Sequence, residues 1–148
     1  MSSVAASSAP GNCRSVTWGR VTLVGLATVA AAVLANLVVY AIGGLVVGYD
    51  PTFLVLATAG GTIIFTIACA IVAVLVYGLI LRFTADPARV FTRVAAVVLV
   101  LSVIPDLTYI PSVPGASGAQ AAVLVLMHVV AAVVIVRVMT MLTRPSPR

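Results

Sequence analysis

Four long apolar runs constrain this chain more than any other feature of its sequence. No charged residue interrupts Val21–Val47 or Phe53–Leu81, and two shorter runs follow before the C-terminus. As a helix, the first run is about 40 Å long. The hydrocarbon core of a bilayer is about 30 Å thick and needs about 20 apolar residues to cross it. We therefore predict an all-α, integral membrane protein that folds as a four-helix transmembrane bundle.

Composition excludes the other broad classes. Of the 148 residues, 63% are hydrophobic and only 7% are charged, which is too few charges to cover a soluble domain or to keep a chain disordered. The net charge is +5, but a nucleic-acid site requires a basic face on a water-exposed domain. Here the arginines occupy short gaps between apolar runs. We therefore expect the lipid bilayer as a partner and no nucleic acid.

The runs predict a simple domain organisation. Residues 1–20 are expected to form a flexible cytoplasmic tail, and residues 143–148 a second one. The four spans are expected at about residues 21–47, 53–81, 94–110 and 120–142. Ala30–Ala32 resembles a signal-peptide cleavage site, but the apolar stretch continues well beyond it, which favours an uncleaved anchor.

The third span leaves two paths open. Its uninterrupted part, Val94–Ile104, covers only about 16 Å as a helix. Either the helix continues past Pro105 to about Ile110, or the chain turns back within the membrane. Continuation is favoured, because bare backbone at that depth needs hydrogen-bond partners.

Arginine placement gives a second, independent reason for four spans. All eight basic residues are arginines, and they lie before the first run, between the second and third runs, and within or after the end of the fourth. The other two connections contain neither Lys nor Arg. With four spans every positive charge falls on one side of the membrane. The positive-inside rule then predicts that both termini lie in the cytoplasm. Gly, Ala and Val dominate the chain, as is common in proteins from GC-rich bacterial genomes, so we expect the bacterial plasma membrane.

Small residues recur at a spacing of four in the first span. Ala27, Ala31 and Ala35 form one such series, and Gly44 and Gly48 form another. This spacing allows helices to approach closely, so both series predict helix–helix contacts.

Three polar side chains inside the runs require an explanation, because an unpartnered polar group is costly in lipid. Counted along the helices, Asp106 lies about 18 Å beyond Val94 and His128 about 21 Å before Leu142. Asn36 falls in the middle-to-outer part of the first span. Together with Ser102, these residues form a candidate intramembrane polar layer in which Asp106 and His128 can share a proton. Each also has a structural interpretation: Asn36 as an interhelical hydrogen bond, His128 as a packing residue, and Asp106 as an interfacial carboxylate beside a proline kink.

No pattern in the chain predicts catalysis or a bound cofactor. Cys13 and Cys69 are placed too far apart to pair, and there is no Cys-x-x-Cys motif. Phosphate loops, nucleophile elbows and two-histidine metal helices are also missing from the sequence. We therefore expect no catalytic residues, no cofactor, no metal site and no enzymatic activity.

Short motifs in the first, third and fourth spans resemble a known family. Arg89-Val-Phe-Thr-Arg93 leads into an apolar run that ends at Ser102-Val-Ile-Pro105, and Leu-Met127-His128 lies in the fourth span. With Ala35-Asn36-Leu-Val-Val-Tyr40 in the first span, these motifs resemble a bacterial family of small four-span membrane proteins classified as a domain of unknown function. The resemblance covers about residues 15–142. It implies the architecture and a membrane location, and it implies no activity.

Two functions from different classes follow from these observations. We expect foremost a non-enzymatic small interaction or accessory subunit, whose partners are other membrane proteins or a second copy of the chain. The alternative is a small transporter or proton-coupled carrier that uses Asn36, Asp106 and His128.

Overall fold

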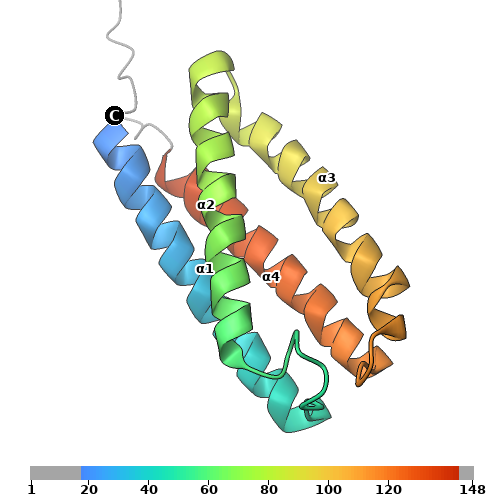
Figure 1. Cartoon of the computed structure of the whole chain (residues 1–148). Coiled ribbons are helices and arrows are strands. Elements are labelled where there is room, and N and C mark those ends of the chain that lie inside the picture. Colours follow the sequence, from blue (N-terminus) through green and yellow to red (C-terminus); the bar gives the residue numbers. More distant parts are fainter. Residues whose placement is uncertain (1–17, 144–148) are drawn as a thin grey trace, which may run out of the picture.

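The computed structural model describes residues 18–143, which form four long helices and no strand. The helices are α1 (Trp18–Val47), α2 (Ala59–Phe83), α3 (Pro87–Thr108) and α4 (Gly118–Leu142), with a 3₁₀ turn η1 (Ile110–Ser112) after α3 (Figure 1). The predicted all-α four-helix bundle is confirmed. The predictions for the two tails, apart from residues 18–20 and 143, lie outside the described residues.

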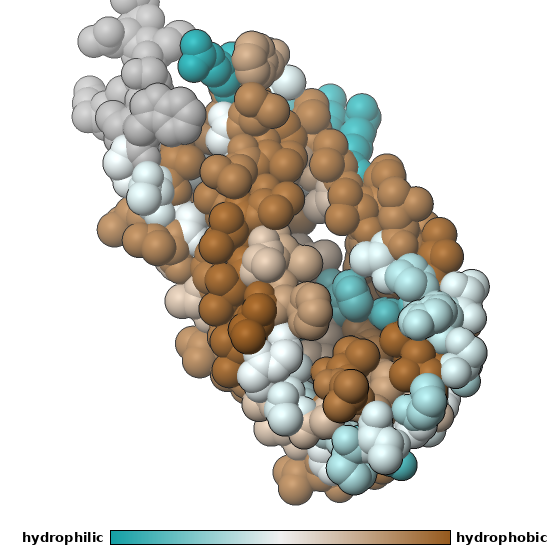
Figure 2. Space-filling view, in the orientation of Figure 1, coloured by the Kyte–Doolittle hydropathy of each residue, from teal (hydrophilic) through white to brown (hydrophobic). Residues whose placement is uncertain are grey.

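All four helices are long and apolar enough to cross a membrane. Their outward side chains are large hydrocarbons, among them Leu45 with 88% of its surface exposed and Phe65 with 70%. Figure 2 shows apolar side chains over most of one face of the bundle, with polar side chains gathered toward the two ends. Such a surface is stable in lipid and unfavourable in water, so the chain is a multi-pass membrane protein.

Small residues on one face of α1 allow the other helices to pack closely against it. The buried positions Thr28, Ala32 and Asn36 recur at a spacing of four and face the bundle. A Cβ atom on nearby Gly25 would lie 2.7 Å from a methyl group of Val74 on α2. The series predicted from Ala27 lies one residue away from this buried stripe, and Ala27 itself is exposed.

The described arginines gather at one end of the bundle, here called the arginine end. These residues are Arg20, Arg82, Arg89, Arg93 and Arg137. They occupy the end at which α1 and α3 begin and α2 and α4 finish (Figure 1). The Arg20 guanidinium donates a hydrogen bond of 2.9 Å to the carbonyl oxygen of Leu142, which joins the start of α1 to the last residue of α4. The opposite end, called the loop end, contains no arginine among the described residues.

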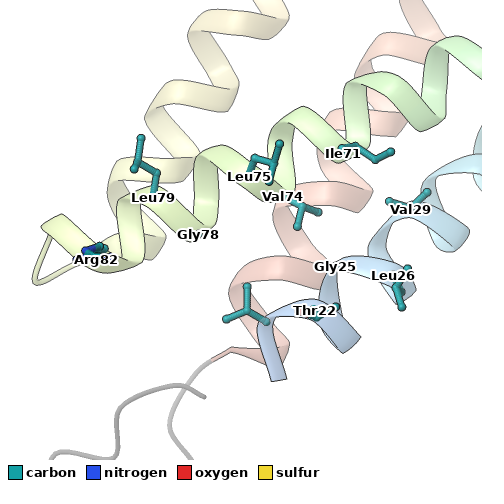
Figure 3. Close-up of a pocket in the computed structure, with 11 residues that line it drawn as sticks. Thr22, Gly25, Leu26, Val29, Ile71, Val74, Leu75, Gly78, Leu79 and Arg82 are labelled. Atoms are coloured by element: carbon teal, nitrogen blue, oxygen red, sulfur yellow. The ribbon is translucent and has the colours of Figure 1, made fainter. Parts of the chain in front are cut away.

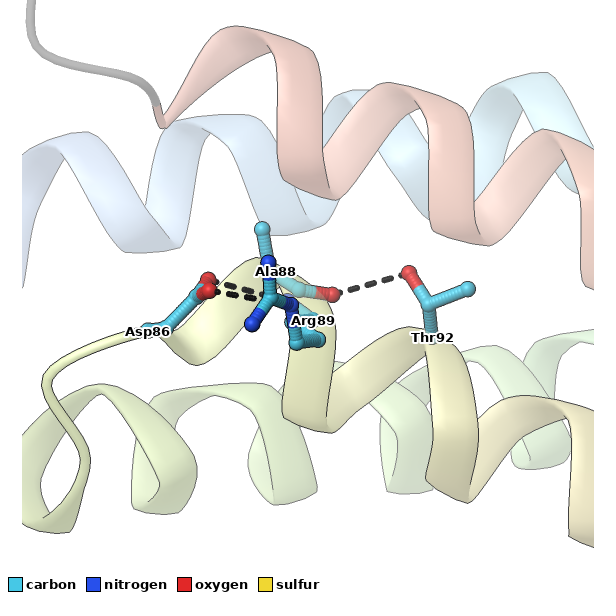
Figure 4. Close-up of polar contacts among 4 residues, drawn as sticks. All are labelled: Asp86, Ala88, Arg89 and Thr92. Carbon is cyan, nitrogen blue, oxygen red and sulfur yellow. Dashed lines mark hydrogen bonds and ion pairs between the residues drawn. The ribbon is translucent and has the colours of Figure 1, made fainter.

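Helix α3 begins at Pro87, seven residues before the Val94 start predicted for the third span. Asp86 is its N-cap, and the Asp86 carboxylate accepts a hydrogen bond of 3.2 Å from the backbone N–H of Arg89 (Figure 4). Proline suits the first helical position because its fixed φ fits the helix and its missing N–H is not needed there. Arg89 and Arg93 therefore lie on the first turns of a helix. Their charge had suggested a connection between two helices instead.

Pro105 lies inside α3 without ending it. The helix continues to Thr108, and the backbone N–H of Tyr109 still donates to the carbonyl oxygen of Pro105 at 2.9 Å. Of the two paths open for the third span, continuation is thus confirmed. The backbone turns only afterwards, through η1.

Residues 48–58 fold over the loop end as a compact cap, here called the loop cap. Phe53 and Leu56 in it are fully buried, and the Tyr40 hydroxyl donates to the carbonyl oxygen of Leu56 at 3.1 Å. Helix α2 accordingly starts at Ala59, six residues after the Phe53 predicted from the apolar run. The run was apolar because Phe53 and Leu56 fill the core from a loop.

Two features shape the loop cap: hydrogen bonds within it and the close approach of a glycine from the connection before α4. The hydroxyl and the backbone N–H of Thr52 both donate to the Asp50 carboxylate, which holds the pKa of Asp50 below its ordinary value. Gly115, in the connection before α4, lies against the same turn with a φ of +77°. A Cβ atom there would lie 2.9 Å from the backbone nitrogen of Phe53.

We predict that Gly115→Ala destabilises the bundle, because it strains a left-handed backbone and pushes the loop cap away from its neighbours. The left-handed conformation alone costs a non-glycine residue about 1–2 kcal/mol. Gly118→Ala is the matched control, since a Cβ atom at Gly118 meets nothing within 4 Å. Unfolding in detergent, followed by circular dichroism, should show a loss for Gly115→Ala alone. Equal stabilities of the two variants would contradict this account of the cap.

Candidate functional site

The interior of the bundle consists of two apolar clusters with polar residues between them. The cluster near the arginine end includes Tyr77, Phe91 and Met139, and the cluster near the loop end includes Phe53, Leu56 and Met127. The rings of Tyr77 and Phe91 pack edge to face with centroids 4.9 Å apart. Between the clusters lie side chains from all four helices that carry polar atoms.

Asp106 and His128 form the central contact of this region. Nδ1 of His128 on α4 lies 2.9 Å from Oδ2 of Asp106 on α3. The same Nδ1 lies 2.9 Å from the carbonyl oxygen of Leu124, one turn earlier on α4. A single ring N–H cannot point at both oxygens. The hydrogen bond is made with Leu124, and Oδ2 of Asp106 has no hydrogen bond although it is buried.

Exposure differs sharply between the two partners. The Asp106 side chain is 9% exposed, whereas that of His128 is 38% exposed. The carboxylate is therefore held inside the bundle, and the imidazole is the partner that can meet molecules from outside.

Asn36 makes the second polar contact, between α1 and α2. Its amide nitrogen Nδ2 donates to the hydroxyl oxygen Oγ1 of Thr66 at 3.0 Å. The other end of the amide, Oδ1, is buried and accepts no hydrogen bond. Asn36 thus joins two helices with its donor and leaves its acceptor free.

These contacts meet at one cavity of about 310 Å³, here called the polar cavity. Asn36, Thr66, Asp106 and His128 line it on different helices, and apolar side chains complete the wall. Figure 2, in the orientation of Figure 1, shows a hollow between α2 and α3 with polar atoms at its edge. A cavity of this size falls within the range of small-molecule sites, which are mostly apolar with a few converging polar groups.

Three of the four residues predicted for the polar layer therefore come together, and Ser102 does not. Ser102 is half-buried, and its hydroxyl donates back to the carbonyl oxygen of Leu99 at 2.8 Å, within its own helix. It is not among the residues that line the polar cavity. Serine and threonine commonly make such bonds in helices, so Ser102 needs no partner from another helix.

The second helix contributes residues that the sequence interpretation did not single out. Thr62, Thr66, Phe65 and Cys69 on α2 line the polar cavity. Thr62 and Thr66 recur at a spacing of four, with Ala70 one turn further, and all three are buried. That spacing was the available signal, because it places the threonines on one inward face of a helix.

A second hollow, of about 460 Å³, lies between α1 and α2 near the arginine end. Figure 3 shows its walls, which are aliphatic except for Thr22 and Arg82. Gly25 on α1 and Gly78 on α2 also line it. Hydrocarbon fits this groove, and no group of titratable side chains faces it.

The polar cavity has the chemistry of proton transfer and ligand binding. A carboxylate and an imidazole in contact can hold one proton between them. Within residues 18–143, no three His, Cys, Asp or Glu side chains come together as metal ligands. The site thus combines one acid, one base and two buried acceptor oxygens without hydrogen bonds.

Comparison with known proteins places the chain in a family. It belongs to the family of unknown function DUF6069, whose model matches residues 16–144. The resemblance to a small four-span family of unknown function is thereby confirmed. No curated protein and no solved structure matches the chain.

The Asn36–Thr66 bond predicts a measurable coupling between α1 and α2. Asn36→Leu should destabilise the bundle by about 1 kcal/mol, and a double-mutant cycle with Thr66→Val should give a coupling of about 0.6 kcal/mol. Both values come from unfolding in detergent or mixed micelles. A coupling indistinguishable from zero would mean that Asn36 does not hold the helices together.

Proposed function

We propose that this member of the DUF6069 family is a non-enzymatic, proton-coupled carrier of small solutes in the bacterial plasma membrane. The single observation that supports the proposal most strongly is the contact of 2.9 Å between Asp106 and His128 at the polar cavity. Ionisable residues within transmembrane segments are rare, and they mark proton relays and substrate pathways in membrane proteins. The pair lies between two apolar clusters, where removing charged groups from water costs free energy. A functional role explains why the chain keeps such a pair.

The distribution of charge supports an orientation for this carrier. The arginine end faces the cytoplasm, because positively charged residues next to transmembrane helices are retained on that side. The loop end then faces outward, and the polar cavity lies on the outer side of the bundle, below the loop cap.

We predict that a reporter that is active only in the periplasm stays inactive when it is fused after Arg148. The same reporter inserted after Pro51, in the loop cap, should be active, because the loop cap lies at the end of the bundle opposite to the one at which α4 finishes. Activity after Arg148 would overturn the orientation.

Proton movement tests the carrier itself. The full-length chain in proteoliposomes should move protons when a gradient of solute is imposed across the membrane, measured with an internal pH dye. The assay is run without solute and again with a low-molecular-weight fraction of bacterial cytosol. Asp106→Asn and His128→Gln should each reduce the flux about tenfold or to the level of empty liposomes, because each removes one member of the proton-holding pair.

Asp86→Asn is the matched control for this assay. It makes the same change of carboxylate to amide at the exposed arginine end, and asparagine also serves as a helix N-cap. Its flux should equal that of the wild type. Equal background-level flux in the wild type and all three variants, with and without solute, would overturn the carrier.

The second candidate is a small interaction or accessory subunit. The groove between α1 and α2 favours it, since its mostly aliphatic walls fit a hydrocarbon chain or a helix of a neighbouring protein. This role requires no proton movement. The two candidates therefore differ in the flux assay. They also differ in the mass of the particle extracted from native membranes, which is larger for an accessory subunit because its partner is extracted with it.

A further inference from the structure

We infer that the polar cavity takes a small amphiphilic monocation, an ammonium group attached to hydrocarbon, in exchange for one proton of the His128 imidazolium. The inference rests on the proposed carrier and names the class of its solute. It is carried by four features of the cavity: its unpaired acceptors, its charge, its walls and its opening.

The first feature is a surplus of hydrogen-bond acceptors. Oδ1 of Asn36 and Oδ2 of Asp106 are buried, and neither receives a hydrogen bond. The two residues are only 5% and 6% exposed, so bulk water does not satisfy them. The amide nitrogen of Asn36 is already committed to Thr66. A ligand that fits must supply donors or positive charge, which excludes anions and neutral acceptors such as ethers.

The second feature is the balance of charge. The titratable side chains that line the cavity are Asp106 from α3, His128 from α4 and Cys69 from α2, while α1 contributes the uncharged Asn36. A single carboxylate can neutralise one positive charge. That charge is either the imidazolium of His128 or the cation of the ligand.

Exchange between these two states balances atoms and charge. When the cation approaches Oδ2 of Asp106, the imidazolium of His128 releases its Nε2 proton to the aqueous buffer and becomes neutral. The neutral ring keeps its Nδ1–H on the carbonyl oxygen of Leu124, so no buried donor loses its partner. One positive charge enters the cavity and one leaves it.

The third feature is the wall. Phe65, Leu124, Met127 and Ile135 line the cavity with hydrocarbon, an aromatic ring and a thioether. Aromatic faces attract ammonium groups, and methionine adapts its shape to different ligands. An inorganic cation would leave these apolar surfaces without contacts, whereas an amphiphilic one would cover them.

The fourth feature is the opening beside α2. Phe65 on that wall is 70% exposed, and Cys69 is exposed as well. Both lie on a membrane-spanning helix, so the opening faces the hydrocarbon of the bilayer. Amphiphilic cations accumulate at membrane surfaces and reach such an opening with their apolar part first.

Binding of a defined cation tests the inference. The probe is benzyltrimethylammonium, and its uncharged isostere neopentylbenzene is the control ligand. Calorimetric titration of the full-length chain in detergent micelles is compared with titration of empty micelles, in buffers of different ionisation enthalpy. The cation should bind about tenfold or more tightly than the isostere. Its binding should release about one proton per molecule.

Variants assign these effects to residues. Asp106→Asn should weaken binding of the cation about tenfold or more, and Asp86→Asn should leave it unchanged. His128→Gln should retain binding and abolish the proton release. Circular dichroism melts show whether each variant is folded, and the comparison of cation with isostere in the wild type needs no variant.

Equal affinities for the cation and its isostere, or binding unaffected by Asp106→Asn, would overturn the inference. Failure of the inference is distinguishable from failure of the carrier. Cation binding with proton release but no flux in proteoliposomes upholds the ligand class and overturns transport. Proton flux that depends on Asp106 and His128 without cation binding upholds the carrier and overturns the ligand class.

Discussion

The absence of water from the bilayer interior is the constraint on which this structure depends. Every polar atom within the spans needs a partner inside the protein, and most have one close by. The hydroxyl groups of Thr28 and Thr140 donate to the carbonyl oxygens of Val24 and Val136, each one turn earlier. Against this background the unpaired oxygens of Asn36 and Asp106 are exceptions, and both lie at the same cavity. That coincidence distinguishes a site from two isolated packing defects.

The spans and their packing partners differ in how far the sequence determines them. The uninterrupted apolar runs and the placement of all arginines on one side predict four crossings. A helix that crosses the bilayer must be long and apolar whatever its tertiary contacts are. The depths of Asp106 and His128 in the membrane, counted from residue numbers along the helices, also predict that the two residues lie in one layer. Ser102 shows the limit of this count, since equal depth does not say which way a side chain faces.

Helix ends were harder to predict than helix centres. Phe53 and Leu56 are as apolar as a span but belong to the loop cap, where the Tyr40 hydroxyl holds the carbonyl oxygen of Leu56. That bond joins residues from two elements, so no local sequence pattern predicts it. The start of α3 did leave a trace, because Asp86-Pro87 is an N-cap followed by the residue best suited to the first turn. Charge at Arg89 and Arg93 obscured it.

The loop cap has a consequence for how molecules reach the interior. Phe53 and Leu56 are fully buried and fill the core at the loop end. The flank beside α2 is the side on which the wall is open. For a compound that enters by this flank, the rate of entry rises with its concentration in the lipid phase.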